Sequence, residues 1–117
     1  MNNADIDKRK GNIDQKYIEA RQELDSAYKN RSLKDHTEDS FKENYDKANS
    51  KMKDYERDMR GLCNEVEKFD KEKAESLRKD LADKQEKFQK AQTNLDAQYN
   101  YDRTKYQNMQ RIYTGNY

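Results

Sequence analysis

Apolar residues recur every three or four positions from Phe41 to Phe69 without interruption. The spacing alternates between four and three residues, as the a and d positions of a heptad repeat do. A repeat of this kind gathers its apolar side chains in one stripe along a helix, where a second helix can pack. The segment therefore predicts an all-α, elongated coiled coil.

The predicted helix-packing seam extends beyond this segment. Apolar residues resume after Phe69 one residue out of step, and Lys73 and Lys84 occupy weak seam positions there. The predicted seam residues are Phe41, Tyr45, Ala48, Met52, Tyr55, Met59, Leu62, Val66, Phe69, Leu77, Leu81, Phe88 and Leu95. Because many of them are tyrosine, methionine or alanine, we expect the surface of a partner to complete the seam.

Composition favours long solvated helices over a globular core. The chain is 42% charged and 31% hydrophobic, and it contains no proline. Its 25 basic residues nearly balance its 24 acidic ones, so the high net charge that accompanies disorder is absent. Charges of alternating sign at helical spacing are typical of a salt-bridged helix surface, and the scarce apolar residues fit a narrow stripe between helices.

A first helix is predicted over residues 1–30, where apolar residues repeat every seven positions. These are Ile6, Ile13, Ala20 and Ala27. Residues 31–40 form a polar break, and Asp35 followed by Glu38 resembles a capping box that opens a new helix. A straight rod is the alternative, because Phe41 lies two heptads beyond Ala27 and the register would survive a continuous helix.

One long coiled-coil helix is predicted over residues 41–97. The eleven-residue spacing from Val66 to Leu77 is interpreted as a stutter, which locally relaxes the supercoil. Gly61 offers an alternative chain reversal, but the seam continues through it, so a helical glycine is preferred. The fold prediction is thus a short N-terminal helix plus one long helix, arranged as a helical hairpin or an extended rod.

Residues 98–117 differ from the rest of the chain. They hold only four charged residues but five of the nine tyrosines. Tyrosine anchors many protein interfaces, so this segment is predicted to dock on a protein partner. The predicted docking residues are Tyr99, Tyr101, Tyr106, Met109, Arg111 and Tyr113. Tyrosines beside basic residues also suit single-stranded nucleic acid, but three basic residues against one acidic residue is little positive charge for that role.

The sequence contains no arrangement typical of catalysis. His36 is the only histidine and Cys63 the only cysteine, so neither has a partner at metal-ligand spacing. A glycine-rich phosphate loop and a nucleophile elbow are also missing. We therefore predict no catalytic residue, no cofactor and no metal, and we expect Cys63 to be a free thiol at an outward-facing helix position.

These features predict a structural role. We expect a non-enzymatic coiled-coil subunit that spaces, clamps or bridges components of a large protein assembly, plausibly a virus or phage particle. Its partners would be other protein subunits, including copies of itself, with no membrane and no nucleic acid. No apolar run could serve as a signal peptide or membrane span, so an intracellular or particle-bound location is expected. The alternatives are a small helical chaperone or adaptor for an exported protein, and a nucleic-acid-binding spacer.

Overall fold

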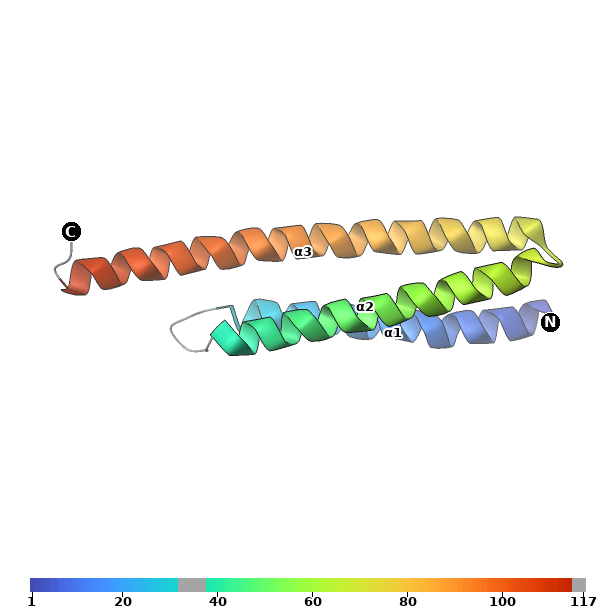
Figure 1. Ribbon diagram of the computed structural model, residues 1–117, viewed down its shortest axis with the longest axis horizontal. Coiled ribbons are helices and arrows are strands. Elements are labelled where there is room, and N and C mark those ends of the chain that lie inside the picture. Colours follow the sequence, from blue (N-terminus) through green and yellow to red (C-terminus); the bar gives the residue numbers. More distant parts are fainter. Residues whose placement is uncertain (32–37, 115–117) are drawn as a thin grey trace.

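The protein is an elongated bundle of three helices. The computed structural model describes the backbone of residues 1–31 and 38–114, and the side chains of residues 1–31 and 40–109. Helix α1 spans Asn3–Lys29, α2 spans Glu38–Glu67 and α3 spans Lys71–Thr114. The helices run up, down and up along a body that measures 70 × 18 × 15 Å, with the α2–α3 turn and the N-terminus at one end and the C-terminus at the other (Figure 1).

The prediction of one long helix over residues 41–97 is wrong, because the chain reverses at residues 68–70. The backbone N–H groups of Phe69 and Asp70 both donate to the Val66 carbonyl, which closes α2. The Asp70 side chain then accepts a hydrogen bond from the Lys73 backbone N–H at 3.0 Å and caps the start of α3. The apparent stutter between Val66 and Leu77 is therefore a turn, and the straight rod is excluded.

The structure also corrects the prediction for Phe69. It was predicted to belong to the packing seam, but it lies in this turn and its side chain is 55% exposed. Gly61, the alternative site for a reversal, lies inside α2. The predicted capping box at Asp35 and Glu38 involves side chains outside the described part of the chain.

The core is one continuous apolar cluster along the long axis. Of the thirteen predicted seam residues, eleven are buried, Tyr45 packs half-buried against the cluster, and Phe69 is exposed. The seven-residue repeat of α1 is buried too, together with Leu24. The expectation that a partner's surface completes the seam is not met, because α1 and α3 of the same chain cover it.

Small residues bring α1 and α2 together. Ala20, Ala27 and Ala48 are fully buried, and side chains this short allow two helix backbones to approach closely. Cys63, predicted to face outward, is instead buried beside Leu62, and burial raises the pKa of its thiol. The prediction failed because Cys63 lies next to the seam, and contact with a third helix widens the buried stripe of α2.

Candidate interaction surfaces

Polar pairs at seven-residue intervals border the contact between α1 and α2. The α1 positions are Arg9, Lys16, Glu23 and Asn30, and the α2 positions are Glu65, Asp58, Lys51 and Asn44. At the third position the contacts are staggered, because Lys51 pairs with Glu19 at 3.7 Å and Asn44 donates to Glu23 at 3.1 Å. Arg9 pairs with Glu65 at 2.5 Å, Lys16 pairs with Asp58, and Asn30 donates to Asn44 at 2.8 Å. The signs are complementary only when the helices run antiparallel in this register, so the pairs help to select it.

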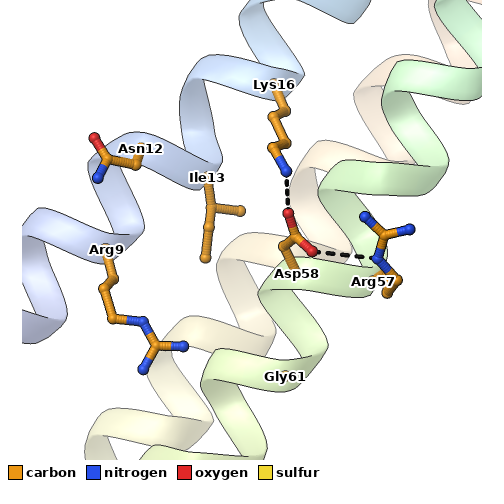
Figure 2. A pocket seen from close by; sticks show the side chains of 7 residues that line it. All are labelled: Arg9, Asn12, Ile13, Lys16, Arg57, Asp58 and Gly61. Atoms are coloured by element: carbon orange, nitrogen blue, oxygen red, sulfur yellow. Dashed lines mark hydrogen bonds and ion pairs between the residues drawn. The ribbon is translucent and has the colours of Figure 1, made fainter.

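A shallow groove of about 490 Å³ lies along this border (Figure 2). Its lining consists of Arg9, Asn12, Ile13, Lys16, Arg57, Asp58 and Gly61. Figure 2 shows Lys16 and Arg57 both reaching Asp58, and the hydrogen bond from Lys16 holds the pKa of that carboxyl below its usual value against the opposing effect of burial. Since each charged side chain of the groove has a partner of opposite sign, the groove offers no unbalanced charge to a ligand.

Four charged side chains form a partly buried ring between α1 and α3. Lys10 binds Asp14 at 2.7 Å and Asp80 at 3.3 Å, and Lys84 binds Asp80 at 2.6 Å and Asp14 at 3.7 Å. Burial alone would raise the pKa of Asp80, but hydrogen bonds from Lys84 and Lys10 lower it. Below we call Lys10, Asp14, Asp80 and Lys84 the ionic ring.

Tyr55, a residue of α2, lies close to the ionic ring. Its side chain is fully buried, and its hydroxyl has no hydrogen-bond partner among the residues that the structure describes. Burial, and then the negative charges of Asp80 and Asp14, raise its pKa. The ionic ring therefore links α1 to α3 through charge pairs that are partly shielded from solvent.

The prediction from the sequence missed the ionic ring, although the sequence contains a signal for it. Lys73 and Lys84 interrupt the α3 seam, and each lies near an aspartate of α1: Lys73 near Asp7 at 3.4 Å and Lys84 near Asp14. A lysine in a seam position marks a place where the facing helix supplies an acidic residue. Asp80 and Lys84 are also spaced four residues apart on α3, and their pair is partly buried.

The predicted docking residues separate into three groups. Tyr99 is a correction: it is only 9% exposed, and its ring stacks on Phe41 with centroids 4.0 Å apart. Tyr101 and Met109 are 63% and 45% exposed, and Tyr106 is half-buried. Arg111 and Tyr113 belong to α3, but their side chains lie outside the described residues.

Helix α3 continues beyond the ends of its neighbours (Figure 1). Arg31, just after α1, pairs with Asp102 at 2.8 Å, and Phe41, near the start of α2, stacks on Tyr99. The remaining helical residues, 103–114, are called the α3 overhang below. This overhang and the nearby Tyr101 are the strongest candidate for an interaction surface.

Comparison of the chain with protein families, with curated proteins and with solved structures gives no match. Within residues 1–31 and 38–114, no group of histidine, cysteine and acidic side chains could hold a metal ion. None of the helices in that part of the chain combines the length and the apolar character that crossing a membrane requires.

Proposed function

We propose that this chain is a non-enzymatic structural subunit that spaces or bridges other proteins and docks on them through the end of α3. One observation carries the proposal. Helix α3 extends beyond the ends of α1 and α2, and it exposes Tyr101 and Met109 near that end of the bundle (Figure 1). Exposed aromatic and methionine side chains on a rigid helix are typical protein-binding anchors. Coiled-coil packing of the helices is part of the proposal, supported by the seven-residue spacing of the polar pairs that border α1 and α2.

The 70 Å length supports the spacer role. Because the three helices fill the seam themselves, the bundle can hold a partner bound at one end away from the other end. The expectation that the assembly is a virus or phage particle stays a prediction from the sequence.

Incorporation into the native assembly tests the proposal. A tagged chain carrying Tyr101→Ser and Met109→Ser is expressed in its source organism and compared with the wild type for co-sedimentation with large complexes. Ile18→Ser serves as the matched control, because Ile18 is similarly exposed but lies on α1. Loss of co-sedimentation in the double variant, with an unchanged circular dichroism spectrum and a normal control, is expected. Equal incorporation of all three proteins would overturn the proposal.

A small helical adaptor is the second candidate. Such a protein must fold alone, and a core that the chain completes by itself favours that property. Size-exclusion chromatography with light scattering in the presence of cell extract separates the two candidates, since an adaptor forms small complexes with one client helix, whereas a structural subunit elutes with large complexes.

A further inference from the structure

The turn between α2 and α3 interrupts helical hydrogen bonding over only a few residues. It consists of residues 68–70, and no glycine or proline occurs between residues 62 and 114. The Asp70 backbone N–H donates to the Val66 carbonyl, and the Ala74 N–H donates to the Asp70 carbonyl. Both bonds join residues four apart, as in a continuous α-helix. The side-chain cap that Asp70 places on Lys73 is the clearest feature that favours the reversal.

The apolar stripes of α2 and α3 would stay in phase if this turn were straightened. Val66 and Leu77 are buried and lie eleven residues apart, which is close to three full helical turns. Phe69 follows Val66 by three residues and precedes Leu77 by eight, and these spacings place all three on one helix face. In the single chain Phe69 does not join that face, because the turn leaves it exposed. A straight helix would give Phe69 a place in the seam that the hairpin denies it.

The register between α2 and α3 is centred on the turn. Three polar pairs join the two helices: Tyr45 with Asp96, Asn49 with Gln92, and Glu56 with Gln85. The midpoint of every pair falls between residues 70 and 71. Two straightened chains that paired antiparallel in this register would therefore share a two-fold axis at that point, without a gap or an offset. Their two Phe69 side chains would lie within about one helical turn of each other along the axis.

From these observations we propose that two copies of the chain exchange α3. In this dimer the turn at residues 68–70 opens, α2 and α3 form one straight helix, and α3 packs on α1 and α2 of the other copy. Contacts such as that of Arg78 with Glu67, at 2.7 Å in the single chain, are kept but join different copies. An exchange of this kind is a low-cost route to a dimer, because only the hinge changes. Each hinge loses the Asp70 cap and gains helical hydrogen bonds and the burial of Phe69.

The exchange goes beyond the proposed function and does not depend on it. A straight helix over residues 38–114 would be about 115 Å long at a rise of 1.5 Å per residue. The two α3 overhangs would lie at opposite ends of the dimer. If the chain docks through its overhang, the dimer bridges two partners, whereas the single chain holds only one at that end.

The first test is the mass of the full chain after refolding from urea at increasing protein concentration. Size-exclusion chromatography with light scattering is expected to show a rise from one copy to two. Asp70→Ala is expected to lower the dimer dissociation constant about tenfold or more, because two caps oppose each dimer, and Asp70→Ser, which keeps an acceptor, is expected to leave it near the wild-type value. Phe69→Ser is expected to raise it about tenfold or more, and the similarly exposed Ile18→Ser is expected to leave it unchanged.

The second test distinguishes exchange from any other dimer. Lys53 and Gln89 are exposed and border one groove between α2 and α3. Lys53→Cys and Gln89→Cys, combined with Cys63→Ala, provide two sites for fluorescent labels that are close together in the hairpin. In the straight helix the same sites are about 54 Å apart. The doubly labelled chain is refolded with a tenfold excess of unlabelled chain, so that each labelled copy has an unlabelled partner.

Energy transfer is expected to be high in the monomer fraction and low in the dimer fraction. A dimer with energy transfer as high as that of the monomer would overturn the proposal, since its copies would have kept their own α3. The proposal would also be wrong if Asp70→Ala stayed monomeric at every concentration, or if Phe69→Ser dimerised as tightly as the wild type. None of these results would affect the docking function, which depends on Tyr101 and Met109.

Discussion

At the scale of single residues, Tyr55 combines a fully buried ring with a buried hydroxyl that lacks a hydrogen-bond partner among the described residues. Its ring fills the space between α1, α2 and α3 and packs against Tyr17 with centroids 5.6 Å apart. A buried hydroxyl without such a partner costs free energy. The ring therefore stabilises the fold and the hydroxyl opposes it.

Tyr55→Phe is expected to leave stability unchanged or to raise the free energy of unfolding by up to about 1 kcal/mol. Tyr55→Ala removes the ring as well and is expected to cost about 3–5 kcal/mol, as truncation of a buried aromatic side chain does. Urea denaturation followed by circular dichroism measures both. A loss of more than about 1 kcal/mol in Tyr55→Phe would show that the hydroxyl is bonded in solution.

Tyr45 gives the fold a dependence on alkaline pH. Its hydroxyl donates to Asp96 at 3.1 Å, and burial together with this hydrogen bond raises the pKa of Tyr45 to about 12, from an ordinary value of 10.0. A raised pKa means that folding favours the protonated phenol. Its contribution to stability is therefore complete below pH 10 and is lost as the pH rises towards 12.

Tyr45→Phe is thus expected to lose less stability than the wild type between these two pH values. Urea midpoints measured across this range test the difference. Parallel pH profiles for the two proteins would contradict the assignment of the raised pKa to Tyr45.

At the scale of elements, the seven-residue pattern predicted which side chains are buried better than it predicted where helices end. Burial depends on spacing, which the sequence shows directly. The turn at residues 68–70 contains no glycine or proline, and Phe69 falls at seam spacing, so only Asp70 as a helix cap signalled it. The one-residue shift between Val66 and Leu77 recorded the reversal, but a shift of register fits a stutter equally well.

The same limit applies to the predicted docking segment, residues 98–117, because composition shows which segment is distinctive but not how its side chains are oriented. Tyrosine content identified the distinctive end of the chain, but it could not show which tyrosines face inward. Tyr99 stacks on Phe41, which lies 58 positions earlier in the sequence, and a contact across that separation depends on the turn that the pattern missed. Tyr101, two residues later, points to the other side of the helix and is exposed.

The cap at Asp70 should fix the start of α3. Asp70→Ala is expected to lower the free energy of unfolding by about 1 kcal/mol, because the Lys73 backbone N–H loses its acceptor. Asp70→Ser keeps an acceptor oxygen and is expected to stay within a few tenths of a kcal/mol of the wild type. Thermal or urea denaturation measures both, and equal losses in the two variants would contradict a capping role.

The border pair of Lys16 and Asp58 should act through complementary charge. Lys16→Glu or Asp58→Lys alone places like charges together and is expected to destabilise the fold by about 0.5–1 kcal/mol. The double exchange restores opposite signs and is expected to recover most of that loss. Urea denaturation of the four proteins forms the cycle, with a matched exchange at the more exposed Glu86 and Lys90 pair of α3 as control. An additive double variant would show that the charges do not interact.

At the scale of the whole molecule, apolar burial holds all three helices, and α3 adds charge pairs with α1 that are partly open to solvent. The central residues of α2, Tyr55, Met59 and Leu62, are fully buried. The contacts of α3 with α1 run through the ionic ring and through the outlying pairs of Lys73 with Asp7 and Arg31 with Asp102. Charge pairs that are partly open to solvent are screened by salt, whereas apolar burial is not. The pairing of α1 with α2 should therefore be the more durable part of the fold.

Hydrogen exchange tests this order. Amides in the centre of α2 are expected to exchange most slowly, those of α3 level with the ionic ring faster, and those of the overhang fastest, because local opening is easiest where few buried contacts hold a helix. Raising the sodium chloride concentration should speed exchange in α3 more than in α1 or α2. If α3 were as protected as α2 and insensitive to salt, its charge pairs with α1 would contribute little to its attachment. The spacer would then act as one rigid body up to Asp102, instead of as a stable pair of helices that carries a third, more loosely bound docking helix.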